Sequence, residues 1–309
     1  TDQTSCTLCT GFAAAGIGIQ YAFIVRLIDV VSRSVPGESL YNFYGYEVEG
    51  VYQSFEDILN SPVNTLQQNN PIITNADGTK SWSTDPTKYN PKNTTYVGDI
   101  KYKDVNGDGV IDENDKTNIG SPLPKFTFGW NNTFVYKNFD LNIFINGSVG
   151  NKVGNYMKMK LTHMNSPWTN QLTDVQSRTR LQPKDGNYSE WWYNDIANVI
   201  TTGVSSMPRA AINDPNDNDA WSSRYIEDGS YVRLKAITLG YTFDAKLIKK
   251  IGLTNLRLTL NATNLLTITG YDGYDPEIGV STASNNVYGL DNGRYPSPTS
   301  VTLGVNVSF

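Results

Sequence analysis

The sequence predicts an all-β protein made of antiparallel strands that belong to a transmembrane β-barrel. Three observations lead to this prediction: segments in which apolar and polar residues alternate, connections that are long and short in turn, and a composition that is poor in charge. Charged residues make up 18% of the 309 residues, and the chain contains 26 Gly and 19 Tyr, a balance typical of strands and polar loops. The mean hydropathy of −0.40 argues against a bundle of transmembrane helices, whereas every second residue of a barrel strand is polar.

Six segments show the period-2 alternation of a strand with one apolar and one polar face. The last segment is the clearest, because apolar side chains occupy every second position from Val301 to Phe309. Its length matches the roughly 9–11 residues of a tilted transmembrane strand. Taken alone, it fits an edge strand of a soluble sandwich equally well. The six predicted strands cover residues 41–53, 126–136, 139–149, 230–243, 255–265 and 299–309.

The first two strands are rich in aromatic residues. In the first, Tyr44 and Tyr46 lie on the face opposite Glu47. In the second, five aromatic residues between Phe126 and Tyr136 share one face. Aromatic and β-branched residues favour strands because they pack well on a pleated surface.

The middle strands differ in their connections and regularity. Lys137 and Asn138 form a two-residue turn between the second and third strands, which predicts a β-hairpin. The alternation of the fourth strand changes phase near Ala236, and a β-bulge would produce that change. In the fifth strand, Leu256, Leu258 and Leu260 lie on the apolar face.

The connections alternate between long and short. Residues 54–124, 150–229 and 266–298 form long connections, whereas residues 137–138 and 244–254 form short ones. Bacterial outer-membrane barrels have short periplasmic turns and long extracellular loops, and a soluble sandwich has no reason to separate them in this way. We therefore predict the membrane barrel, with the C-terminus in the periplasm.

Six strands are too few to close a barrel, because the smallest common ones have about eight. An open sheet edge is not tolerated in hydrocarbon. We therefore expect this chain to be part of a larger protein or to associate with other chains.

The rest of the composition excludes several functions. Residues 1–36 are left unassigned, because the apolar run within them is shorter than the ~20 residues of a transmembrane helix and lacks the basic start of a signal peptide. Cys6 and Cys9 lack partners for a zinc site. The single histidine, His163, is interpreted as a loop residue without a special role. A catalytic constellation is missing, so we predict no enzyme, and a net charge of −5 without a basic run argues against nucleic acid.

The sharpest local motif is D-V-N-G-D-G-V-I-D-E-N-D at residues 104–115, which follows the first half of a calcium-binding loop. Asp stands at position twelve instead of the usual Glu, as in dockerin-type loops, and no clear helices flank the motif. We therefore predict a structural calcium ion that holds an extracellular loop in a fixed conformation. The alternative is an Asp/Asn/Gly turn without metal. The predicted ligands are Asp104, Asn106, Asp108, the carbonyl of Val110, Asp112 and Asp115.

Aromatic residues are frequent in the second long connection. Their rings could stack on sugar rings or pack against a partner, and the alternative is packing within the loop or in an interfacial girdle. The candidate ligand-binding residues are Trp168, Trp191, Trp192, Tyr193 and Trp221.

Five stretches occur in order along the chain: V-G-D-I-K-Y-K at 97–103, I-G-S-P-L-P-K-F-T-F-G at 119–129, S-R-Y-I-E-D-G-S-Y-V-R-L-K at 223–235, N-L-L-T-I-T with G-Y-D-P-E within 264–277, and the terminal strand. Together they resemble the C-terminal region of the SusC/RagA family of TonB-linked outer-membrane proteins, over residues 37–309.

The resemblance implies a fold and a function for the whole protein. It implies a 22-stranded barrel around a plug domain, of which this chain supplies about six strands, and TonB-driven import of glycans or peptides across the Gram-negative outer membrane. It also implies a SusD-like lipoprotein as partner. The terminal strand resembles the assembly signal of outer-membrane proteins, carried here by Val305, Val307 and Phe309. The alternative function is a calcium-stabilised surface binding or adhesion module without transport.

Overall fold

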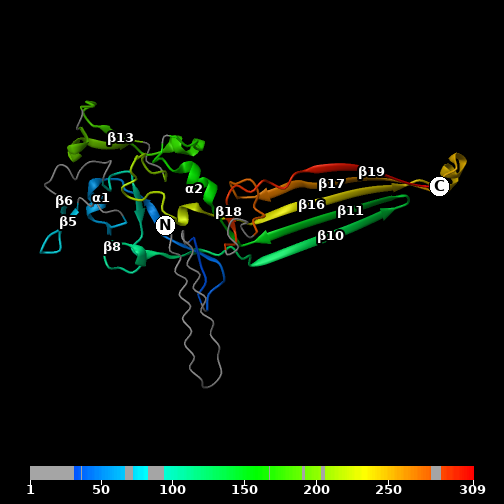
Figure 1. Ribbon diagram of the computed structural model, residues 1–309, viewed down its shortest axis with the longest axis horizontal. Helices are drawn as coiled ribbons and strands as arrows, with labels where there is room; N and C mark the ends of the chain where they lie inside the picture. Colours follow the sequence, from blue (N-terminus) through cyan, green and yellow to red (C-terminus); the bar gives the residue numbers. More distant parts are fainter. Residues whose placement is uncertain are drawn as a thin grey trace, which may run out of the picture.

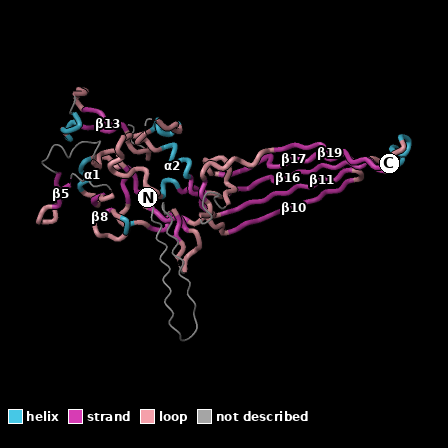
Figure 2. Tube along the Cα trace, in the orientation of Figure 1, coloured by secondary structure: helices cyan, strands magenta, loops and turns pink. Residues whose placement is uncertain are grey.

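The computed structural model of the chain describes residues 31–35, 37–66, 72–82, 94–166, 168–189, 192–202, 206–279 and 287–309. Within them, a long antiparallel sheet extends from a more globular part that is built of short strands and helical turns (Figure 1 and Figure 2). Residues 1–30, which include both cysteines, lie outside the described parts of the chain.

The long sheet has five strands, in the spatial order β10-β11-β16-β17-β19. Each strand pairs antiparallel with the strand of this sheet that follows it along the chain. Five of the six predicted strands are thereby confirmed, and the fifth predicted strand extends four residues further than expected. The bounds are β10 (Phe126–Tyr136), β11 (Phe139–Val149), β16 (Tyr231–Thr242), β17 (Asn255–Thr269) and β19 (Ser300–Ser308).

The register places the apolar side chains of all five strands on one face. One row of directly opposed residues crosses the whole sheet through Phe134, Leu141, Leu239, Leu260 and Leu303. Opposed residues in a sheet share a face, so this row is continuous. Four of these five side chains are exposed, and Leu303 has 71% of its surface accessible. The apolar face is therefore not covered by other parts of the described chain.

The opposite face is polar and carries an ion pair that crosses β16. Asp140 on β11 and Arg257 on β17 approach to 2.7 Å, although β16 lies between their strands. Gly240 on β16 lies directly beneath the pair, and a Cβ atom there would be 2.5 Å from both the Arg257 Nη2 and the Asp140 Oδ1 atoms. The absence of a side chain at residue 240 therefore makes room for the ion pair.

The predicted irregularity near Ala236 is confirmed. The pairing between β16 and β17 shifts register between Leu234 and Ala236, and the pairing with β11 shifts at the same place. Asn264 on β17 adopts a left-handed backbone conformation, with φ of 52°. The irregularity moves the apolar side chains from one set of alternate positions to the other, so that both halves of β16 remain on the same face.

The strand predicted over residues 41–53 is wrong. The segment forms two short strands, β2 (Asn42–Gly45) and β3 (Val48–Val51), in the globular part rather than in the long sheet. Phe43, Tyr46 and Tyr52 are all buried, although strict alternation would put Phe43 on the opposite side of a strand from the other two. The segment is therefore covered by protein on both sides, and its alternation does not mark a lipid-facing strand.

The globular part contains small sheets. β1 (Ser32–Arg33), β2 and β9 (Thr117–Gly120) form one sheet, and β12 (Lys152–Asn155), β15 (Ile226–Asp228) and β18 (Leu290–Asp291) form another. The two-stranded sheets are β3 with β7 (Ile100–Tyr102), β4 (Val63–Asn64) with β8 (Val110–Ile111), β5 (Ile72–Thr74) with β6 (Lys80–Trp82), and β13 (Arg180–Pro183) with β14 (Val199–Thr202).

The helices are short. The α-helices are α1 (Phe55–Leu59), α2 (Tyr156–Thr162) and α3 (Ala245–Ile248). The 3₁₀ turns are η2 (Glu113–Asp115), η3 (Thr173–Ser177), η4 (Trp192–Asn194), η5 (Ile196–Asn198), η6 (Ser223–Tyr225) and η7 (Lys249–Ile251). Across the described ranges, no helix combines the length and the apolar character needed to cross a membrane.

The buried core lies in the globular part. One cluster joins Tyr46, Val51, Ile100, Tyr102 and Ile111, which lie between the end of β2 and β8. A second cluster is built around Tyr52, Ile58 and Tyr96. The predicted long connection over residues 54–124 is therefore folded, and it shares its core with residues 46–52.

The two ends of the sheet differ. The turn at Lys137, the segment that contains α3 and η7, and the C-terminus lie at one end, whereas the globular part lies at the other (Figure 1). Within the described residues, β10 and β19 each pair with one strand only, so the sheet is open at both edges.

The ion pair and Gly240 generate a test. In a strand, Gly→Ala stabilises by about 0.5–1 kcal/mol, but at residue 240 the new methyl group displaces the pair between Asp140 and Arg257. We expect Gly240→Ala to raise the free energy of unfolding by about 0.5–1 kcal/mol more in an Arg257→Gln background than in the wild type. Urea unfolding of the chain in detergent, followed by tryptophan fluorescence, measures this coupling.

The matched control is Gly129→Ala on the same polar face, where a Cβ atom meets only Phe144 at 3.5 Å. This variant should have the same effect in both backgrounds. Equal effects of Gly240→Ala in the two backgrounds would contradict the role assigned to Gly240.

Candidate functional site

A buried ion pair holds together segments of the globular part that are far apart in sequence. Asp99 and Arg209 are almost completely buried, and the Arg209 Nε atom lies 2.7 Å from the Asp99 Oδ1 atom. Arg209 also donates through Nη2 to the second carboxylate oxygen at 2.9 Å. Two buried charges are tolerated only when they are paired and hydrogen-bonded, so the position of Arg209 is fixed by Asp99.

Two asparagines extend this network into the loop that follows Arg209. Asn218 donates to Asp99 at 3.0 Å and accepts the N–H group of Ile100 at 2.7 Å. Asn216 donates to the Ile100 carbonyl at 2.9 Å and accepts from the side chain of Asn64 at 2.9 Å. These hydrogen bonds attach the loop to β7 and β4 and give it a defined conformation.

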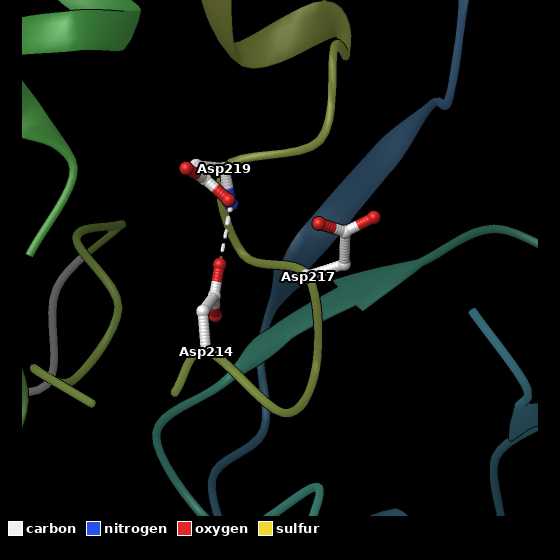
Figure 3. Close-up of side chains that lie close together, drawn as sticks. All are labelled: Asp214, Asp217 and Asp219. Atoms are coloured by element: carbon white, nitrogen blue, oxygen red, sulfur yellow. Dashed lines mark hydrogen bonds between the residues drawn. The ribbon is translucent and has the colours of Figure 1, made fainter. Parts of the chain in front are cut away.

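The loop gathers three carboxylates. Asp214, Asp217 and Asp219 each place one carboxylate oxygen within 4.8 Å of the other two, and no other His, Cys, Asp or Glu residues in the described ranges form such a group. Figure 3 shows that all three project from this one loop, with the Asp214 carboxylate accepting the backbone N–H group of Asp219. Carboxylate oxygens are ligands that Ca²⁺ and Mg²⁺ prefer, so the group could hold a hard cation.

Burial changes the acidity of this group. Burial, followed by a hydrogen bond to the Asp219 side chain, raises the pKa of Asp214 from 3.8 to about 8. Burial, followed by the negative charge of Asp219, raises the pKa of Asp217 to about 6. Because the pKa of Asp214 is higher in the folded chain, its ionisation opposes folding increasingly as the pH rises from about 4 towards 8.

His163 lies beside the acidic group, although the sequence assigned it no role. Its Nδ1 atom is 3.3 Å from the Asp219 Oδ2 atom, which makes an ion pair when the imidazole is protonated. The sequence carries no signal for this contact, because 55 residues separate the two positions.

A cavity of about 290 Å³ adjoins the acidic loop. Asp217 and Asp219 line it together with Tyr46, Trp221, Lys116 and other residues. Burial, followed by the charge of Glu113, raises the pKa of the Tyr46 hydroxyl, and this hydroxyl has no hydrogen-bond partner in the described part of the chain. The cavity combines aromatic faces with charges of both signs.

The calcium-like loop folds around its own backbone N–H groups. Asp104 accepts from Gly107 at 2.6 Å and from Gly109 at 2.8 Å. Gly109 has φ of 84°, which is the turn that the motif requires of this position. The buried Asp115 accepts from Val105 at 2.9 Å and thereby closes the loop. The structure thus brings Asp104 and Asp115 to one turn, and calcium binding there stays a prediction.

The remaining predicted ligands of this loop are also engaged locally. Asn106 accepts the Asp108 N–H group, and Asp108 accepts the Val110 N–H group, both at 2.9 Å. Asp112 caps η2, accepting from Asn114 at 2.7 Å. Backbone hydrogen bonds therefore define the conformation of each predicted side-chain ligand.

The candidate aromatic residues do not form one surface. Trp168 is 92% exposed, and Trp191 lies outside the described residues. Trp192 and Tyr193 contact each other in η4, with ring centroids 6.0 Å apart. Trp221 stacks on Tyr225 in the core instead, with the rings inclined by 20°. Among the four that the structure describes, Trp221 alone lines the cavity beside the acidic loop.

The residues of the predicted assembly signal lie on the apolar face at the end of β19. Val305 and Val307 continue the apolar alternation. Val305, Val307 and Phe309 are all exposed, Phe309 to 91%. Their exposure is consistent with contact to lipid or to an assembly factor.

Comparison with curated proteins identifies relatives of this chain. It is 33% identical over 277 residues to TonB-dependent receptor P3 of Formosa agariphila, which aligns with 88% of this chain and 22% of the relative. It is 31% identical to TonB-dependent receptor P26 of the same organism, over 90% of this chain and 23% of the relative. TonB-dependent receptor SusC of Bacteroides thetaiotaomicron is 26% identical over 67% of this chain and 17% of the relative. No family model matches the chain.

Comparison with solved structures identifies the same fold. The RagAB peptide transporter superimposes with a TM-score of 0.53 over 92% of this chain and 24% of that chain, at 17% identity. The open-open state of the RagAB peptide importer gives a TM-score of 0.54 with the same coverage and identity.

These relatives are named as receptors rather than as enzymes, and the chain spans 17% to 23% of their length. The resemblance to the SusC/RagA family, which the sequence motifs indicated, is confirmed by SusC among the curated relatives and by RagAB among the structures. The chain belongs to the SusC/RagA family of TonB-dependent receptors.

Proposed function

We propose that this chain is a section of a TonB-dependent importer that takes up nutrients, either glycans or peptides, across the Gram-negative outer membrane. The observation that carries the proposal is the long sheet, which has an exposed apolar face and a polar face with an ion pair. A sheet of this kind is stable where lipid contacts one face and a water-filled or protein-filled lumen contacts the other.

The arrangement of the connections supports an orientation. In outer-membrane barrels the short turns face the periplasm, so the C-terminus of this chain lies in the periplasm and the globular part faces the cell exterior. A SusD-like lipoprotein would then contact the globular part. The TonB system would act through a plug domain contributed by another part of the protein.

The cavity beside the acidic loop, with Trp221 and Tyr46 among its lining residues, is a candidate contact for either ligand class. A surface binding module without transport is the alternative function, and it is favoured by the separate core of the globular part.

We also propose that the loop over residues 104–115 binds a structural calcium ion. The support is the match to the calcium-loop template and the single turn that contains the predicted ligand residues. A cation there would hold together negative side chains that otherwise repel one another.

Uptake by intact cells tests the transport function. Deletion of the complete gene that encodes this chain should abolish uptake of either labelled oligosaccharides or labelled oligopeptides, and the class that is lost identifies the nutrient. Collapse of the proton-motive force should have the same effect on wild-type cells. Unchanged uptake of both classes would leave the binding module as the better explanation.

Phe309 provides a test of membrane assembly. Deletion of Phe309 from the complete protein should lower the amount of folded receptor in the outer-membrane fraction severalfold, because Phe309 continues the exposed apolar alternation of β19. Phe309→Trp should assemble normally and serves as the control. Normal assembly without Phe309 would argue against an assembly signal in this strand.

Calorimetric titration with calcium tests the metal site. We expect the wild-type chain to bind calcium and Asp108→Ala to lose this heat. Asp185→Ala is the matched control, because Asp185 also accepts a backbone N–H group in an exposed turn, at 2.9 Å from Asn187, but lies outside the loop. The calcium site is discarded when wild type and Asp108→Ala give the same heat.

A further inference from the structure

A short helical segment lies at the end of the long sheet that is opposite the globular part. It consists of α3 and η7 and connects β16 to β17 (Figure 1 and Figure 2). Asp244 caps its start by accepting the Lys246 N–H group at 2.9 Å, and Gly252 ends it with φ of 77°. Ile248 is buried and α3 contacts β17. The segment is therefore a defined helical structure attached to the sheet.

The outer side of this segment exposes two large apolar side chains. Leu247 is 60% exposed and Ile251 is 67% exposed. The two side chains are four residues apart in this short segment, which therefore exposes apolar surface at this end of the sheet. Phe309 and Tyr136, both exposed, lie at the same end of the sheet on its apolar face. Exposed apolar side chains of the strands and of the helical segment therefore occur at the same end of the sheet.

Basic side chains surround these apolar residues. Lys246, Lys249 and Lys250 belong to the segment, and Lys137 lies in the turn at the same end of the sheet. All four are exposed, and none of them forms an ion pair with another described residue. Asp244 is the one acidic residue of the segment, and the nearby Asp140 is already paired with Arg257. This end is therefore locally positive in a chain whose net charge is −5.

We propose that the segment formed by residues 244–252, together with Lys137, binds the surface of a phospholipid leaflet that carries anionic headgroups. Leu247 and Ile251 enter the boundary between headgroups and acyl chains, and the lysines contact the phosphates. This inference rests on the proposed function, because it requires the long sheet to span the membrane with its short turns at the inner leaflet.

Three observations favour a lipid surface over a protein partner. Exposed apolar side chains flanked by lysines are the pattern of an interfacial helix, and lysines bury their stems while their charged ends reach the headgroups. The segment lies at one end of a sheet whose exposed apolar face is of the kind that contacts lipid (Figure 1). The positive charge is complementary to anionic phosphates. A protein partner would explain the charge but not the position of the segment at the end of an exposed apolar sheet face.

Vesicle binding of the full 309-residue chain tests the inference. The chain is mixed with vesicles of phosphatidylcholine alone or with added phosphatidylglycerol, and the bound fraction is measured by flotation. The net negative charge of the chain would by itself disfavour anionic vesicles, so we expect tighter binding to phosphatidylglycerol only because of the lysine-rich end. The triple variant K246Q/K249Q/K250Q should lose about tenfold to a hundredfold in affinity for anionic vesicles.

The matched control removes the same charge elsewhere. K125Q/K160Q/K184Q replaces three exposed lysines outside this end of the sheet and should keep the preference for anionic vesicles. A second readout places a probe in the apolar surface: Leu247→Trp should add fluorescence that lipids brominated on their acyl chains quench. Leu40→Trp, at a residue of the globular part that is 57% exposed, should add fluorescence that these lipids do not quench.

The outcomes separate this inference from the proposed function. A wild-type chain that binds neither kind of vesicle overturns both the proposed membrane location and the proposed lipid contact of residues 244–252. Equal binding to both kinds of vesicle, or an unchanged preference in K246Q/K249Q/K250Q, overturns the lipid contact alone. The lipid contact is supported when that variant loses the preference for anionic vesicles, K125Q/K160Q/K184Q keeps it, and the probe at residue 247 is quenched.

Discussion

The antiparallel register of the long sheet is the constraint on which the rest of the structure depends. Because opposed residues share a face, the alternation within each strand adds up to one apolar surface and one polar surface over five strands. A shift of one residue in any pairing would move every side chain of that strand to the opposite face of the sheet. The irregularity between Leu234 and Ala236 is therefore required: the sequence of β16 changes phase there, and the backbone changes register at the same point.

The same constraint explains where charged residues occur in the sheet. Arg257 and Asp140 are acceptable on the polar face because they pair with each other across β16. Their pairing needs a strand without a side chain between them, and Gly240 fulfils this need at the cost of the packing that a larger residue would add. The sheet has no buried core of its own. The globular part is instead stabilised by a closely packed aromatic core and by the buried ion pair between Asp99 and Arg209.

The sequence predicted the sheet well and the globular part poorly, for a physical reason. The bounds of β10 and β11 follow directly from a local alternation that extends over eleven residues in each strand. The segment around Tyr46 shows a similar alternation, but both of its sides are covered, and a local pattern does not distinguish lipid from a protein core. The acidic group was missed because Asp214 and its neighbours resemble an ordinary solvated turn. The residues that bury this turn, such as Asp99, lie more than a hundred positions away in the sequence.

The two ends of the sheet also differ in charge, and this difference has a structural origin. The globular end concentrates carboxylates in the loop with Asp214 and in the calcium-like loop, where a protein core and backbone N–H groups compensate them. The opposite end has little room for such compensation, because a two-residue turn and a short helical segment are all that connect its strands. Lysines there remain hydrated and available, and exposed apolar residues such as Leu247 remain uncovered. A membrane-spanning sheet with these two ends has only one favourable orientation towards a surface of phospholipid phosphates: the helical segment faces that surface, and the acidic globular part faces away from it.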